Sequence, residues 1–338
     1  NANVTFINVV NTVTEDAYEK VNGEIAGRSP RGIFYTGEGE FTKGLVVIST
    51  GDGSKVIEPT DFSYMMDFSE MFYFAPDPCV MECLCKNMYG YNEYVIMSGR
   101  VYTRNLSFVE DMFVKYDPQV KGDYEAAPFS MYESNDPFFY DQKGKRFIYD
   151  DYGKMISVES ASGAFNPAAM EATMVYGVAF EDNVRAVMED ADGHHFVIAA
   201  QKRVEYDDDF YNSYIRVIPI RKVDLNQTDI GEATCFAVSS KDIDFLYYGY
   251  QNKIVCMSTV TGNVLATYDG FEEGNKIDYI EFDRSENPNR LYVGVSNGSG
   301  KAKSGSIYYL RMSSNGSLEE ENHFNNICGR VVDFEYNK

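Results

Sequence analysis

Short apolar strands separated by polar turns recur along the chain at a regular spacing, which is found in few folds. Four segments share one pattern, an apolar strand, a polar turn and a second strand that opens with an aromatic residue or Leu. They are FFYDQKGKRFIYDD (138–151), RAVMEDADGHHFVIAA (185–200), CFAVSSKDIDFLYYG (235–249) and IEFDRSENPNRLYVGV (280–295). Strand starts near Val80, Phe138, Arg185, Cys235, Ile280 and Val331 follow at intervals of 45–58 residues. Such a period, built only of short strands, is typical of the blades of a β-propeller.

The predicted fold class is therefore all-β, a single β-propeller. Six strand starts favour six blades, and seven stay open as an alternative because residues 86–138 are long for one blade. The alternation in RVVDFEYN (330–337) predicts a C-terminal strand that closes the propeller by pairing with N-terminal strands from 32–58. Such pairing would remove an open sheet edge.

The rest of the domain organisation is simple. Residues 1–30 are predicted to form a lead-in segment, and residues 31–338 to form the propeller domain. Segments 60–72 and 166–175 are predicted as short helices between strands.

The charge and apolar content of the chain exclude some kinds of partner and of membrane attachment. Thirty basic side chains against 52 acidic ones give a net charge of −22, which repels a phosphate backbone and an anionic membrane surface. A nucleic-acid partner is therefore not expected. No run of about 18 apolar residues is present, so no transmembrane helix is expected.

The six cysteines are predicted to be buried free thiols, because their neighbours are apolar. They are Cys79, Cys83, Cys85, Cys235, Cys256 and Cys328. A zinc site would need a further ligand, and His194, His195 and His323 show no matching spacing.

One acidic turn is a candidate metal site. Glu189, Asp190 and Asp192 lie within MEDADGHHF, and carboxylates suit a hard cation such as calcium. Asp and Gly are also the residues that a hairpin turn requires at this position. Turn chemistry is the favoured interpretation, and calcium stays open as the one candidate cofactor.

A long acidic and aromatic insertion lies between two predicted strands at 205–214. Its candidate binding residues are Tyr206, Asp207, Asp208, Asp209, Phe210, Tyr211 and Tyr214. Loops on a rigid scaffold collect binding groups, and aromatic faces stack on sugars or pack on peptide side chains. The alternative is a solvated loop whose aromatic rings fold back onto the blade.

Tyr89 and Tyr91 flank a turn at Gly90 and are two further candidates for ligand or partner binding. Their alternative role is cross-strand packing. No nucleophile elbow, zinc-binding helix or phosphate loop is present, and we predict that the chain is not an enzyme. The absence of Trp slightly favours peptide or protein contacts over glycan contacts.

Several stretches together resemble the PKD-like family of Bacteroidetes surface lipoproteins. They include RSPRGIFY, GLVVISTGDGSKVIEPTDFSYMMDFSEMFYFAPD, GDYEAAPFSMYESNDPFFYDQKGKRFIYDD, FLYYGYQNKIVCMST and GRVVDFEYN. In that family immunoglobulin-like modules precede a propeller. None of the stretches is a catalytic signature.

The resemblance implies a lipoprotein on the extracellular face of the outer membrane, anchored through a segment not present in this chain. Its implied partners are a SusC-like TonB-dependent barrel and a SusD-like lipoprotein, with an oligopeptide or a glycan as cargo. The predicted function is a non-catalytic accessory of this nutrient import complex, acting by docking and cargo binding. The alternative is a free-standing carbohydrate-binding or glycan-cleaving propeller.

Overall fold

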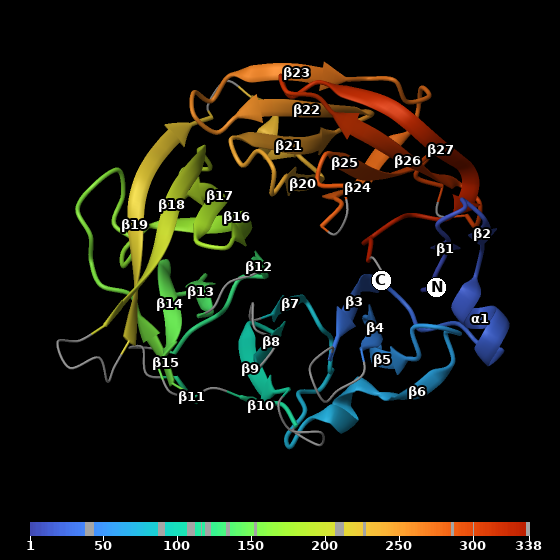
Figure 1. Cartoon of the computed structure of the whole chain (residues 1–338), viewed down its shortest axis with the longest axis horizontal. Coiled ribbons are helices and arrows are strands. Elements are labelled where there is room, and N and C mark those ends of the chain that lie inside the picture. The colour runs from blue at the N-terminus through green and yellow to red at the C-terminus, as the bar shows by residue number, and fades with distance from the viewer. Residues whose placement is uncertain are drawn as a thin grey trace. The chain divides into compact units, whose positions relative to one another are not determined.

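The computed structural model describes residues 1–37, 44–86, 92–106, 112–115, 117–118, 123–132, 136–151, 154–206, 213–225, 228–284, 287–299 and 301–335. The chain is an all-β six-bladed β-propeller, as the strand period predicts (Figure 1). It divides into two compact units, one of residues 1–35, 46–66 and 227–338 and one of residues 36–45 and 67–226. No helix among the described residues is long and apolar enough to cross a membrane.

The first unit contains three blades of four strands each. One blade is formed by β3 (Pro30–Thr36), β4 (Leu45–Thr50), β5 (Gly53–Ile57) and β6 (Tyr64–Asp67). The next is formed by β20 (Cys235–Val238), β21 (Phe245–Tyr250), β22 (Lys253–Ser258) and β23 (Val264–Tyr268), with the 3₁₀ turn η2 (Ile230–Glu232) before it. The third is formed by β24 (Lys276–Phe282), β25 (Arg290–Ser296), β26 (Gly305–Met312) and β27 (Leu318–Cys328). In each, strands that follow one another in the sequence are neighbours in the sheet.

The second unit also contains three blades, two of which include one strand that pairs in parallel. One blade is formed by β7 (Cys83–Lys86), β8 (Asn92–Met97), β9 (Arg100–Asn105) and β10 (Val114–Lys115), after η1 (Phe68–Met71). The next is formed by β13 (Phe138–Asp141), β14 (Arg146–Asp151), β15 (Lys154–Ser157) and the parallel strand β11 (Asp117–Pro118). The third is formed by β16 (Ala172–Phe180), β17 (Asn183–Asp190), β18 (His195–Tyr206), β19 (Ser213–Asp224) and the parallel strand β12 (Ser130–Tyr132).

Of the two predicted short helices, the one at 166–175 is wrong and the one at 60–72 is present only in part. Within 166–175, Ala172 and Met174 are buried while Thr173 and Val175 are exposed, and this alternation belongs to the strand β16. The predicted start at Arg185 therefore falls in the second antiparallel strand of its blade rather than the first. Segment 60–72 contains the strand β6 followed by the short 3₁₀ helix η1, which has Asp67 at its N-cap, so this prediction is confirmed only for its last turn.

The C-terminal residues close the first unit through side chains and not through a strand ladder. Residues 331–335 form no strand, which corrects the expected strand pairing. Instead, the carboxylates of Asp333 and Glu335 accept the backbone N–H groups of Ile33 (2.9 Å) and Tyr35 (2.9 Å) on β3. Val331 packs directly against the backbone of Gly294. A Cβ atom at position 294 would lie only 2.3 Å from the Cβ of Val331, so only Gly leaves room for this contact.

This closure predicts a pH dependence of stability. Burial raises the pKa of Asp333 to about 6, against the opposing effects of the Ile33 N–H, Arg284 and Tyr279, and Glu335 adds to the rise. A folded-state pKa above the unfolded value stabilises the fold at low pH, and this stabilisation is lost as the pH rises through the folded pKa. From about pH 5 to about pH 7.5 the free energy of unfolding of the wild type should fall by about 1 kcal/mol relative to that of Asp333→Asn. The side-chain amide oxygen at position 333 of this variant can still accept the Ile33 N–H.

Chemical denaturation of both proteins across this pH range measures the difference. A difference in the free energy of unfolding between the two proteins that stays constant across this pH range would show that folding does not raise the pKa of Asp333.

The lead-in segment packs on the blade of β3–β6. It forms the short pair β1 (Phe6–Ile7) and β2 (Val13–Thr14), followed by the helix α1 (Ala17–Asn22). Tyr18 is fully buried in a small core with Ala2, Ala26, Val46, Ile48 and Ile57. These apolar contacts fix α1 against β4 and β5.

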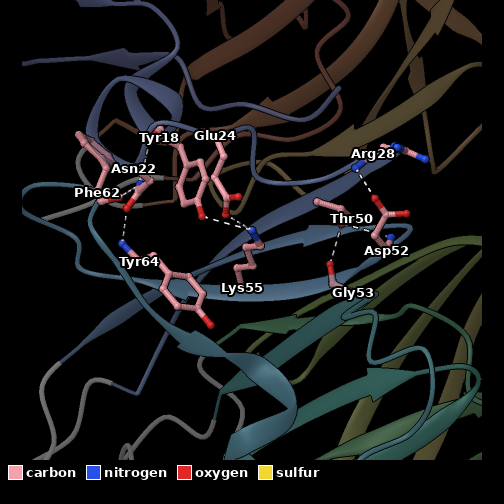
Figure 2. Close-up of polar contacts among 10 residues, drawn as sticks. All are labelled: Tyr18, Asn22, Glu24, Arg28, Thr50, Asp52, Gly53, Lys55, Phe62 and Tyr64. Atoms are coloured by element: carbon pink, nitrogen blue, oxygen red, sulfur yellow. Dashed lines mark hydrogen bonds and ion pairs between the residues drawn. The ribbon is translucent and has the colours of Figure 1, made fainter.

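Polar contacts reinforce this packing, as Figure 2 shows. Lys55 on β5 donates to Glu24 (2.9 Å) and to the hydroxyl of Tyr18 (3.4 Å), and its ammonium lies over the rings of Tyr18 and Tyr64. The Asn22 amide donates to the carbonyls of Tyr18 and Phe62, both at 2.9 Å, and accepts the Tyr64 N–H at 2.8 Å. Asn22 therefore joins α1 to the turn before β6.

We expect Asn22→Ala to lower the free energy of unfolding by about 1–3 kcal/mol, because it removes three hydrogen bonds to backbone groups. The matched control is Glu24→Ala, which removes only an exposed ion pair with Lys55 and should cost less than about 1 kcal/mol. Denaturant titration of the two variants compares them. Equal losses would mean that the Asn22 bonds add nothing beyond an exposed contact.

Candidate functional site

The hairpin of β18 and β19 carries the predicted binding insertion. Its two strands pair from Phe196 opposite Asp224 to Tyr206 opposite Ser213, so the hairpin is longer than the others in its blade. Tyr206 is 57% exposed at the end of this pairing. Asp207, Asp208, Asp209, Phe210 and Tyr211 lie outside the described residues.

Tyr214 is held by its own hairpin. Its hydroxyl donates to Glu205 (3.1 Å), and this bond raises the pKa of Tyr214. Arg216 lies over the ring and pairs with both Glu205 (3.3 Å) and Glu159 (3.0 Å). Tyr214 also packs against the hydrophobic core of its unit, so the structure gives it a supporting role and leaves Tyr206 as the exposed ring.

The acidic turn between β17 and β18 is organised by Asp190. Its carboxylate accepts the backbone N–H groups of Asp192 and His194, both at 2.9 Å, and lies 3.3 Å from Nδ1 of His194. The two N–H bonds lower the pKa of Asp190, with that of His194 the larger cause. The third predicted residue, Glu189, points instead to His195 (3.4 Å).

Asp190, Asp192 and His194 are the one group of three metal-ligand side chains within reach of each other among the described residues. An imidazole and two carboxylates differ from the all-oxygen set that calcium prefers. The bonds of Asp190 are those of an Asx-type turn, which the Asp and Gly of this segment also predict. This group is therefore part of the hairpin turn.

The two other candidate residues, Tyr89 and Tyr91, lie outside the described residues. Their neighbour Tyr94 on β8 is buried and meets Phe139 edge to face at 6.2 Å, which is a packing role.

The cysteines are free thiols, as predicted, and five of the six are buried. Burial raises the pKa of Cys79, Cys256 and Cys328 to about 12 and that of Cys235 to about 11. Thiols with such pKa values stay protonated at neutral pH and are poor nucleophiles.

The structure also has an exposed apolar surface that was not predicted from the sequence. It consists of two aromatic side chains, Tyr73 and Phe74, with Val114 beside them, and we call it the aromatic surface. The three side chains are 59%, 90% and 44% exposed. A parallel bridge between Phe72 and Phe113 brings the two segments together, and the Tyr73 N–H donates to the Phe113 carbonyl (3.3 Å). Tyr73 and Phe74 therefore emerge beside β10, at the edge of their blade.

Buried aromatic side chains, the aromatic base, anchor the two segments that carry the aromatic surface. Phe72 stacks on Phe113 at 4.8 Å and meets Tyr102 and Phe68 edge to face. The guanidinium of Arg104 lies 4.8 Å from the Phe113 ring. This base anchors the backbone of the segment that carries Tyr73 and Phe74.

A buried ion pair fixes Arg104. Nε and an Nη of Arg104 donate to one carboxylate oxygen of Glu93, at 3.0 and 2.8 Å, and the other oxygen accepts the Gly37 N–H (3.0 Å). Glu93 is fully buried and Arg104 is 8% exposed. The pair therefore supports the aromatic base from the side away from solvent.

Known proteins add evidence on the fold alone. No family model and no curated protein matches the chain by sequence. Among solved structures, that of U3-55K is similar with a TM-score of 0.52 and 8% identity, over 90% of this chain and 84% of that one. The β-propeller domain of Cps50 (Swd1) from Myceliophteria thermophila gives a TM-score of 0.39 and 11% identity, over 80% of this chain and 94% of that one.

Proposed function

We propose that the chain is a non-catalytic docking propeller that binds a partner protein through the aromatic surface. The observation that carries the proposal is Phe74, whose side chain is 90% exposed next to the exposed Tyr73 on a buried aromatic base. Exposed apolar clusters on an ordered surface mark interaction sites. Tyr is also enriched among the residues that dominate binding energy.

Charge favours a basic partner. With a net charge of −22, the chain attracts positively charged surfaces and repels acidic ones at long range. Asp77 and Glu82, which follow the aromatic pair in the sequence, are both acidic and exposed. The partner is therefore a protein that offers an apolar recess with Lys or Arg around it.

The resemblance to surface lipoproteins supplies the proposed identity of this partner. We propose a SusC-like barrel with its SusD-like lipoprotein, on the extracellular face of the outer membrane. In this role the chain is an accessory of nutrient import, and its hairpin at 205–214 is the proposed contact for an oligopeptide or glycan cargo.

A pull-down of the tagged chain from its own membranes in mild detergent tests the proposal. We expect a TonB-dependent barrel and a SusD-like protein to be recovered in comparable amounts. Recovery of the chain alone, with partners absent also after gentle cross-linking, would contradict the docking role.

A free-standing glycan-binding propeller is the second candidate, and the exposed ring of Tyr206 favours it. It predicts saturable sugar binding by the isolated chain, weakened by Tyr206→Ala. A glycan array followed by titration of the two proteins decides this, and the absence of any saturable binding would remove this candidate.

A further inference from the structure

We infer that β23 is a second interaction site, which binds an extended segment of a partner protein as an added β-strand. This inference concerns a different blade from the aromatic surface and does not depend on the proposed function. The bound segment carries alternating apolar and basic side chains.

The hydrogen-bonding edge of β23 is open. Within the described part of the chain, β23 pairs only with β22, and it is the last strand of its sheet (Figure 1). In an antiparallel pair every second residue directs its N–H and C=O groups away from the partner strand. These groups of β23 are therefore available to a further strand.

The sequence of β23 does not protect this edge. Natural edge strands avoid pairing by means of charged residues, Pro or a covering segment. The strand β19, at the edge of its own sheet, contains Pro219, Arg221 and Lys222, and β27 contains Glu319–Glu321. In contrast, β23 reads Val-Leu-Ala-Thr-Tyr, without a charge or a Pro.

Exposed apolar side chains surround the open edge. Val264 is 50% exposed, Leu265 is 45% exposed at an irregularity in the pairing with β22, and Val260 in the preceding turn is 43% exposed. An added strand would cover these side chains while its backbone pairs with the edge. β-Strand addition uses this combination, backbone bonds for affinity and side-chain contacts for specificity.

Acidic side chains near β23 favour a bound segment that carries basic side chains. Asp269, Glu272 and Glu273 follow β23 and are exposed, and no ion pair links them to other described residues. Glu320 approaches the hydroxyl of Tyr268 at the end of the strand (3.4 Å). Lys or Arg side chains on the incoming strand would meet this acidic end, whereas Asp or Glu side chains would be repelled.

The test uses a fluorescein-labelled peptide of about ten residues in which Val alternates with Lys. Two further peptides carry N-methyl groups on every second residue. In one peptide this blocks the N–H groups along one edge of the strand, and in the other it blocks those along the opposite edge. We expect the wild-type chain to bind the parent peptide, one N-methylated version to bind about tenfold or more weakly, and the other to bind nearly unchanged. A Val–Glu peptide should not bind.

Two variants and one positional measurement locate the site. Val264→Lys with Leu265→Lys should weaken binding about tenfold or more, whereas Val9→Lys with Val10→Lys, which adds the same charge at exposed positions in the lead-in segment, should weaken it much less. Hydrogen exchange of the amides of β23 should slow when the peptide binds to the wild type. Equal binding of both N-methylated peptides, or unchanged exchange in β23, would overturn the inference.

Discussion

Replacing Glu93 by Ala is expected to lower the free energy of unfolding by about 3–5 kcal/mol. Glu93 is fully buried, and its loss leaves the guanidinium of Arg104 buried without its carboxylate. The Gly37 N–H loses its acceptor as well. Since Arg104 also lies over Phe113, we expect the near-ultraviolet signal of the aromatic base to change in the folded variant.

The matched control removes both charges. Breaking one side of a buried pair costs more than replacing both partners by apolar residues of similar volume. Glu93→Leu combined with Arg104→Met should therefore recover most of the stability lost in Glu93→Ala, when both are measured by denaturant titration. A double variant as unstable as the single one would contradict the ion-pair explanation and indicate a packing role for the two side chains.

Replacing Tyr73 and Phe74 by Ala is expected to cost about 2 kcal/mol or more at each position in the affinity for the docking partner. The reason is that both rings are exposed in the free chain and would be buried in the complex. This corresponds to about a 30-fold rise in the dissociation constant for each variant. Isothermal titration or surface binding with the partner recovered from membranes measures it.

Stability provides the internal control for these two variants. Side chains that are 59% and 90% exposed contribute little to the fold, so the free energy of unfolding should change by less than about 0.5 kcal/mol. Val9→Ala, at a 93% exposed position in the lead-in segment, is the matched binding control. Equal affinities for Phe74→Ala, Val9→Ala and the wild type would refute docking through the aromatic surface.

The strand period was sufficient to predict the fold. A four-stranded blade cannot bury both faces alone, so a period of short strands requires neighbouring blades. Prediction failed where local patterns were ambiguous. Residues 166–175 look helical by composition, yet they form no helix, and the alternating burial of Ala172–Val175 belongs to β16. Likewise, alternation at 331–335 indicates which side chains share a face, but not that their backbone pairs with another strand.

The candidate site was less predictable than the fold. MFYF at 71–74 has the composition of a buried strand, and only the bridge of Phe72 with Phe113, distant in sequence, separates buried Phe72 from exposed Phe74. Tyr214 was a reasonable binding candidate by type, but its bond to Glu205 and its contact with the core depend on tertiary structure. The role of Asp190 in capping the turn after β17 was predictable because Asx chemistry is local.

Site-specific photo-cross-linking from position 74 tests the central claim most directly. A photoreactive phenylalanine analogue replaces Phe74 in the full chain, and the same analogue at position 10 is the control. Irradiation of living cells should join position 74 to one outer-membrane protein, with little product from position 10. Product that is absent from position 74, or that is the same from both positions, would contradict a docking role for this surface.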